Sequence, residues 1–393
     1  MVSSKLLIQN KNYVTIYLSM FSDVSEECPM PFYHDFKRYV SDETYPNKAD
    51  WIARRLLTLR YDLAQTITKD RRPNSLVIGS WNIRAFDGGM PRLDESFHYI
   101  AEIISAFDVC AIQELRDDLR PLKRLVGLLG PNWDYFVTDV GDHEGANYER
   151  AGFVYNKDKV FFRNVIGEIV IPSDTLSGGR QIARTPFFAA FQSGWFRFTL
   201  CSSHVIYGNS LAKRAEEITA ITKALLKRAK KEDQVFIFLG DMNIESRDDE
   251  VWRALEDSGM EVPTFPQTNM KGDKFYDQIA YTVDGASTRK TRLLRHGIFD
   301  WRNSVFGPAQ EPDPDAPDDP EFVTRITDAA YEAHYEPINA AMRTDYGKEP
   351  YANFASQYAN NFMTFEMSDH LPIWVELEVD YSDEYLARFI ETP

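Results

Sequence analysis

The sequence predicts an α/β fold from three features. An apolar run at 75–86 is followed by an amphipathic helix pattern from about Leu93 to Phe107 and by a second apolar run at 108–115. A strand, a helix and a strand within about forty residues form a βαβ-like unit, whose strand ends line a shared crevice. Further apolar runs each end in polar residues, and a long amphipathic helix from Leu211 to Lys231 separates two of them.

Composition and charge narrow the functional class. The 393 residues are 44% hydrophobic and 26% charged, which is typical of a globular protein. The net charge of −16 argues against a protein that coats nucleic acid through overall positive charge, but it does not exclude a nucleic-acid enzyme with a local basic patch. No apolar stretch approaches 18 residues, and residues 1–20 lack the uninterrupted apolar core of a signal peptide. We therefore predict a cytoplasmic protein with no membrane partner.

The chain is predicted to have two parts. Apolar residues recur at helical spacing from about Pro31 to Thr68, which predicts an N-terminal helical extension over 1–75. Residues 76–393 form the second part. An acidic, proline-rich run at 307–322 and a helical pattern after it predict an insertion at about 303–361. The extension and the insertion are candidate surfaces for a protein partner.

Two polar residues end the first two predicted strands. SLVIGSWNIRAF contains Asn82 and Arg84 near its end, and DVCAIQEL ends in Glu114. A capping role explains Asn82 or Glu114 alone, but it explains less well a pair at matched ends of neighbouring strands.

The next runs bring further charged residues to strand starts. Tyr148 and Glu149 precede an apolar run at 152–155, which we expect to form a hairpin with the run at 160–162 about the turn NKD. The strand in RTPFFAAF opens after Arg184.

The run VFIFLGDMN is the most informative part of the middle of the chain. Its five consecutive apolar residues predict a fully buried strand, after which Gly240 permits a tight turn. Asp241 and Asn243 are two residues apart and are expected to project to one side. The preceding strand, FRFTLCSSH, ends in His204.

The last polar strand ends are Asp277, early in FYDQIAYTV, and the pair Asp369 and His370 in FEMSDHLPIWVEL. Apolar residues alternate after the pair, which predicts a strand at 373–377 with one buried face. By itself the SDH tripeptide is a weak signal. Its weight comes from the upstream strand ends that share its form.

Together these strand ends bring carboxylates, amides and two histidines from separate strands. The oxygen ligands suit a hard cation such as Mg²⁺ or Ca²⁺, because no cysteine pair or HxxxH spacing indicates zinc. A hard cation beside two imidazoles indicates hydrolysis of a phosphate ester. A carboxylate that pairs with a histidine fixes its tautomer and orientation.

The motifs WNIRAF, AIQELR, NYERAGFVY, ARTPFFAAF, SSH, LGDMN, YDQIAY and SDHLPI follow one another between Leu76 and Val379. In this order they resemble the endonuclease/exonuclease/phosphatase superfamily, and most closely deoxyribonuclease I. The resemblance implies an α/β (α+β) four-layer sandwich of two packed, mainly antiparallel β-sheets flanked by helices. It also implies a metal-dependent phosphodiester hydrolase, an endonuclease on DNA, that uses Mg²⁺ with Mn²⁺ or Ca²⁺ as alternatives.

Site residues follow from the resemblance position by position. The implied metal ligands are Glu114 and Asn82, with Asp369 close by. The implied catalytic residues are His204 paired with Glu149, His370 paired with Asp277, and Asp241 and Asn243, which orient water and phosphate. The implied substrate contacts are Arg84, Arg116, Tyr148 and Arg184.

Two alternatives stay open. The first is an enzyme with the same chemistry that acts on RNA, a nucleotide or a phospholipid head group. This chain has YDQI where the family usually has YDRI, so Gln278 lacks the positive charge that the family usually has at this position. A non-catalytic binding module is the other alternative. Loss of His204 or His370 would have favoured it, and both are present.

Overall fold

The computed structural model describes residues 31–40, 48–86, 88–139, 148–172, 174–179, 181–182, 184–208, 210–232, 234–283, 291–307, 310–312, 323–325 and 327–390. Most of the acidic run at 307–322 lies outside these residues. The chain divides into two compact units. One falls within 1–70, 92–106 and 300–366, and the other within 71–91, 107–299 and 367–393.

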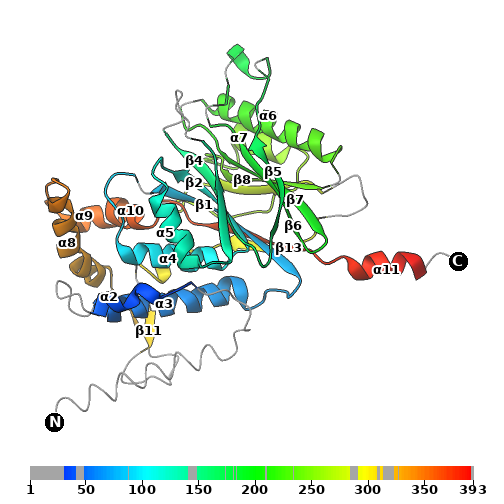
Figure 1. Cartoon of the computed structure of the whole chain (residues 1–393). Coiled ribbons are helices and arrows are strands. Elements are labelled where there is room, and N and C mark those ends of the chain that lie inside the picture. The colour runs from blue at the N-terminus through cyan, green and yellow to red at the C-terminus, as the bar shows by residue number, and fades with distance from the viewer. Residues whose placement is uncertain are drawn as a thin grey trace, which may run out of the picture. The chain divides into compact units, whose positions relative to one another are not determined.

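The second unit contains two β-sheets (Figure 1). The six-stranded sheet has the order β10-β13-β1-β2-β4-β3. Its strands are β1 Ser75–Phe86, β2 Val109–Leu115, β3 Trp133–Val137, β4 Arg150–Asn156, β10 Leu293–Ile298 and β13 Ile373–Glu378. The five-stranded sheet has the order β5-β6-β7-β8-β9. Its strands are β5 Phe161–Glu168, β6 Phe187–Ser193, β7 Phe196–His204, β8 Val235–Asp241 and β9 Asp277–Tyr281.

The predicted fold class is confirmed. Neighbouring strands pair antiparallel in both sheets except β1 with β2 and β7 with β8, which are parallel. The parallel pairing of β1 and β2 sets Asn82 opposite Gln113, next to Glu114. Two polar strand ends predicted to match therefore do lie at the same edge of the sheet.

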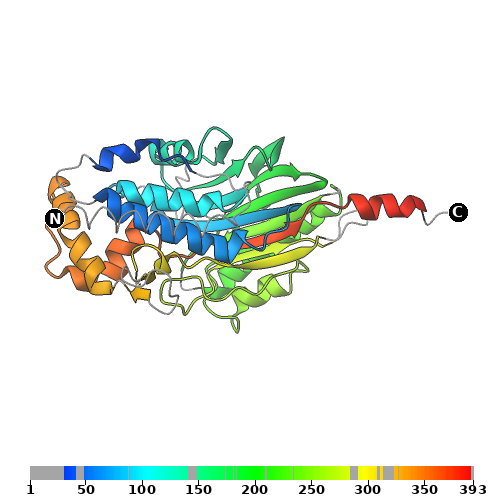
Figure 2. The same cartoon turned by 90° about the horizontal axis from the view of Figure 1, so that it is seen from below.

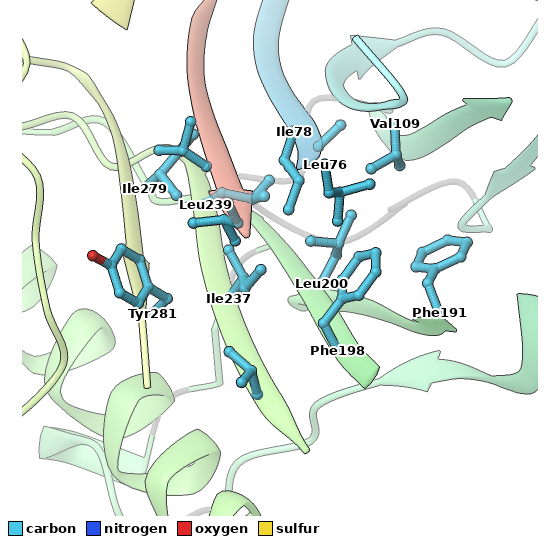
Figure 3. Packing of buried hydrophobic residues seen from close by; sticks show 14 of the residues in the cluster. Leu76, Ile78, Val109, Phe191, Phe198, Leu200, Ile237, Leu239, Ile279 and Tyr281 are labelled. Atoms are coloured by element: carbon cyan, nitrogen blue, oxygen red, sulfur yellow. The ribbon is translucent and has the colours of Figure 1, made fainter. Parts of the chain in front are cut away.

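The core lies between the two sheets (Figure 3). β1 contributes Leu76 and Ile78, and β8 contributes Ile237 and Leu239, all of them buried. A second apolar cluster joins the other face of β8 to helices α6 Leu211–Ala229 and α7 Glu250–Glu256 (Figure 1). Apolar contact on both faces explains why every residue of β8 is buried, as its unbroken apolar run predicts.

The predicted hairpin about NKD is wrong. β4 pairs with β2 and β3 in one sheet, whereas β5 pairs with β6 in the other. Phe153, Tyr155 and Val160 all belong to the core between the sheets. The chain passes from one sheet to the other at this turn, because both flanking segments bury apolar side chains in the same core.

Two further differences concern the last strand and its neighbour. β13 buries both faces, since Trp374 and Glu376 are as inaccessible as the alternating apolar residues. Glu376 accepts a hydrogen bond from Arg295 Nε at 2.6 Å. Arg295 belongs to β10, which lies in the polar segment KTRLLRHG, and its charge compensates the buried carboxylate.

The first unit consists mainly of helices. They are α2 Lys37–Val40, α3 Lys48–Leu63, α4 Asp94–Ser105, α8 Asp328–Asp345, α9 Phe354–Gln357 and α10 Met363–Glu366, with short helical turns at His34–Phe36, Ala64–Thr68, Trp301–Asn303 and Tyr358–Phe362 and a strand pair, β11 Gln310–Pro312 and β12 Val323–Arg325. α3 and α4 lie side by side (Figures 1 and 2).

Segments far apart in sequence form the core of the first unit. Trp51 on α3 stacks on His334 of α8 with ring centroids 4.0 Å apart, and Arg55 donates to the Tyr331 hydroxyl at 2.8 Å. The N-terminal helices and the helices after residue 327 therefore pack together in one unit. The domain boundary at 75/76 and the insertion at 303–361 stay predictions. Among the described residues, no helix is long and apolar enough to cross a membrane.

Gly240 is required by the backbone at the end of β8. Its φ is +130°, and a Cβ atom at this position would overlap the carbonyl oxygen of Ser203 on the neighbouring strand. We expect Gly240→Ala to lower the free energy of unfolding by about 3 kcal/mol, because the overlap costs about 1–3 kcal/mol and the positive φ about 1–2 kcal/mol. Chemical denaturation measures this loss.

Gly127→Ala is the matched control. Gly127 lies in helix α5 Arg120–Leu129, and a Cβ there would meet no atom within 4 Å. This change should raise stability by up to about 1 kcal/mol through helix propensity. Equal effects of the two substitutions would contradict the steric argument.

Candidate active site

Strand ends from both sheets meet at Asn82. Its side-chain amide Nδ2 donates to Glu114 Oε1 of β2 at 3.0 Å and to Asp241 Oδ2 of β8 at 3.0 Å. Glu114 Oε2 also accepts a hydrogen bond from the backbone N–H of Ala85 at 2.8 Å. One amide therefore connects the carboxylates at the ends of the two sheets.

His204 is held by a carboxylate and an arginine. Its Nδ1 lies 3.1 Å from Glu149 Oε2, and Arg184 Nε lies 3.0 Å from the same oxygen. Arg116 Nη2 lies 3.9 Å from Glu149 Oε1. Glu149 therefore joins His204 to two sequence-predicted arginines, which can neutralise negative charge beside the imidazole.

His370 has the same arrangement on the other side. Its Nδ1 lies 2.7 Å from Asp277 Oδ2. The Nε2 atoms of His370 and His204 then both approach Asp241 Oδ2, at 3.8 Å and 3.4 Å. The two imidazoles thus flank one carboxylate, each with a separate acidic residue behind its Nδ1.

Neighbouring charges shift the pKa values of His370 and Glu114. Burial alone would lower the pKa of His370, but the carboxylates of Asp277 and Asp241 outweigh it and hold the pKa well above 6.5. Burial would raise the pKa of Glu114, and the nearby His204 together with the hydrogen bonds from Ala85 and Asn82 lowers it instead. Glu114 is therefore held as a carboxylate.

The backbone is strained at several of these positions. Glu114, Asn243 and Tyr148 have φ values of 63°, 51° and 56°, and Ala85 has 44°. Non-glycine residues seldom adopt this conformation, and such residues cluster at functional sites. Asn243 lies beyond the end of β8, where its backbone N–H donates to Asp241 Oδ1 at 2.9 Å and its side-chain amide donates to the Val205 carbonyl at 2.7 Å. The direction of the Asn243 side chain is therefore set by a turn, and not by the strand alternation that the sequence predicted.

The remaining predicted residues lie around this centre. Arg84 follows Asn82 on β1 and is partly exposed, and Tyr148 is 65% exposed next to Glu149. The Asp369 carboxylate also raises the pKa of His370, although less than Asp277 and Asp241 do.

Ser368 was missed as a positioning residue. It is fully buried, donates to the Asn82 carbonyl at 2.6 Å, and accepts from the backbone N–H groups of His370 at 3.0 Å and Arg84 at 3.3 Å. These bonds fasten the SDH turn to the end of β1. Its place directly before Asp369 and His370 was the available signal, but a serine in a loop carries little weight by itself.

The donor set fits a divalent cation. Asn82 Oδ1 and Asp277 Oδ1 are buried atoms without a hydrogen-bond partner among the described residues. Asp241, Asp277 and His370 offer ligand atoms within 4.8 Å of one another. Two groups can therefore hold an ion, one built on Glu114 and Asn82 and one on the Asp241 side.

Comparison with known proteins decides the family. The model of the Endonuclease/Exonuclease/phosphatase family matches residues 79–323. The chain belongs to this family. Members are hydrolases of phosphate esters that depend on a divalent metal ion, and this chain is a phosphoester hydrolase of that class. No curated protein matches its sequence.

Solved structures include three that are similar to this chain, and the first of them supports the fold. An endonuclease/exonuclease/phosphatase family protein from Bacteroides thetaiotaomicron is 16% identical, with a TM-score of 0.50 over 79% of this chain and 100% of that one. A mannosyl-6-phosphatase from Bacteroides thetaiotaomicron VPI-5482 is 16% identical, with a TM-score of 0.49 over 77% and 99%. A humanized TDP2 from D. rerio is 15% identical, with a TM-score of 0.47 over 77% and 99%.

Proposed function

We propose that this protein is a Mg²⁺-dependent phosphodiesterase of the deoxyribonuclease I type that cuts DNA. One observation carries the proposal: two histidines, each backed by its own carboxylate, approach Asp241 Oδ2 from two sides. Hydrolysis of a diester needs one group that takes a proton from water and one that gives a proton to the leaving oxygen. A pair of oriented imidazoles supplies both.

Glu114 and Asn82 are the proposed metal ligands, with Asp369 close by. A bound divalent ion supplies positive charge that neutralises the non-bridging phosphate oxygens. The alternative group, Asp241 with Asp277 and His370, is less suitable, because Asp277 already holds His370 Nδ1 at 2.7 Å and an ion there would occupy His370 Nε2, the atom that the mechanism needs for proton transfer.

The proposed mechanism assigns the remaining groups to positioning and charge. Glu149 and Asp277 orient the two imidazoles so that each presents its Nε2 to the reacting phosphate. Asp241 and Asn243 orient water. Arg184 and Arg116 lie beside Glu149, and their charge favours binding of the phosphate backbone.

Activity on three phosphate esters, namely a plasmid, a generic diester and a monoester, tests the proposed substrate. Nicking of supercoiled plasmid in Mg²⁺ should vanish with EDTA and in His204→Ala. Hydrolysis of bis-p-nitrophenyl phosphate without nicking would favour RNA, a nucleotide or a phospholipid head group as the natural diester. Hydrolysis of p-nitrophenyl phosphate, a monoester, with no activity on either diester would overturn the proposal. The cytoplasmic location, and a protein partner at 303–361 or 1–75, stay predictions.

A further inference from the structure

Two tyrosines outside the catalytic set border the candidate site. Tyr207 follows His204 by three residues and is 64% exposed. Tyr276 directly precedes Asp277, is partly buried, and has its ring centroid 5.6 Å from the His370 ring at an interplanar angle of 32°. One ring therefore lies in the loop after His204, and the other lies in the loop before Asp277, the carboxylate that orients His370.

Both loops are fixed to the same short segment, residues 241–244. On one side, the backbone N–H of Val205 donates to the Asp241 carbonyl at 2.8 Å, and Asn243 Nδ2 donates back to the Val205 carbonyl at 2.7 Å. On the other side, the Met242 N–H donates to the Tyr276 carbonyl at 2.8 Å. The positions of Tyr207 and Tyr276 are thus set by the segment that also carries Asp241.

A buried cation supports the Tyr207 ring. The Arg214 guanidinium lies 5.8 Å from the ring centroid, and its side chain is buried. It donates to the Asn243 carbonyl at 2.5 Å and to Glu245 Oε1 at 2.8 Å. Lys274 binds the other Glu245 oxygen at 3.2 Å. Glu245, a carboxylate close to the rings, is therefore neutralised by two cations, so it does not repel a polyanion.

We infer that Tyr207 is a stacking platform for an unpaired nucleobase next to the scissile phosphate, at a site that Tyr276 also borders. Anchored loops limit the entropy lost when a base stacks, and the exposed Tyr207 ring offers the π-face that the base needs. A base in a duplex has both faces stacked on neighbouring bases, so it cannot reach Tyr207 without leaving the helix. Sugar phosphates and lipid head groups lack a π-face. The inference rests on the proposed nuclease function and narrows it to single-stranded segments or ends.

Equilibrium binding tests the platform separately from catalysis. Fluorescence anisotropy in EDTA would compare a labelled single-stranded oligodeoxynucleotide with the same strand made abasic throughout, using the full chain. Tyr207→Ala should weaken binding of the intact strand about tenfold, as expected for loss of one base–aromatic stack, and leave the abasic strand within about twofold. Tyr207→Phe should retain wild-type binding, because the stacking face is kept.

Tyr385→Ala is the matched control, since Tyr385 is an exposed tyrosine on helix α11 Ser382–Ile390. This variant should bind the intact strand as tightly as the wild-type protein does. Equal losses for intact and abasic strands in Tyr207→Ala would overturn the platform, as would a wild-type protein that does not prefer the intact strand. Failure to cleave both the plasmid and the single-stranded oligodeoxynucleotide in Mg²⁺, with the binding preference intact, would instead remove the nuclease function and leave the platform in place.

Discussion

His370→Ala is expected to lower turnover of a phosphodiester at least about 10²-fold while the protein stays folded. The imidazole Nδ1 is held by Asp277 at 2.7 Å, so its Nε2 has a fixed direction towards Asp241, where we propose that the phosphate reacts. Loss of an oriented general acid or base costs about 10²- to 10⁴-fold. Steady-state hydrolysis of bis-p-nitrophenyl phosphate measures the loss, and circular dichroism checks the fold.

His204→Ala should cause a loss of the same order, because Glu149 orients that ring in the same way. His296→Ala is the matched control. His296 is exposed on β10, and its ring contacts the Thr264 carbonyl at 3.2 Å, so turnover should stay near the wild-type value. Near-normal turnover in His370→Ala or His204→Ala would remove that histidine from the mechanism.

A double-mutant cycle tests whether Asp277 affects turnover through its contact with His370. Asp277→Asn keeps the shape of the side chain and removes the charge that holds His370. Because the two residues act as one unit, Asp277→Asn should cost little further activity once His370 is alanine. Additive losses would show that Asp277 acts on the reaction by another route.

Glu114→Gln is expected to raise the Mg²⁺ concentration needed for half-maximal activity by about tenfold or more. The substitution keeps the shape of a side chain that contacts Asn82 and the Ala85 N–H, and it removes the negative charge that a hard cation requires. A titration of activity against Mg²⁺ measures the shift, and calorimetry with Mn²⁺ measures ion binding directly.

Two comparisons sharpen this result. Glu376→Gln changes another buried glutamate, one that is held by Arg295, and should alter stability without moving the Mg²⁺ titration. A shift in Asp277→Asn with none in Glu114→Gln would place the ion at the group of Asp241, Asp277 and His370. An unchanged titration in Glu114→Gln would exclude Glu114 as a ligand.

Local patterns were sufficient for most strands of the second unit and for the composition of the site. Burial along one short segment produces an apolar run such as that of β8, with polar residues where the run ends. Both features can be seen in the sequence itself. The ordered motifs also identified the family, and the family model matches 79–323. The sequence therefore determined which residue types lie at the strand ends and which chemistry they suit.

The tertiary structure decided everything that depends on distant partners. Sheet membership at the NKD turn could not be predicted, because the same pattern of apolar residues satisfies a hairpin or a crossing between sheets. The burial of Glu376 required Arg295, 81 residues away. The approach of both imidazoles to one oxygen of Asp241, the strained φ at Glu114 and the role of Ser368 likewise follow from contacts between separate strands. Such contacts are set by packing of the two sheets, and no local pattern records them.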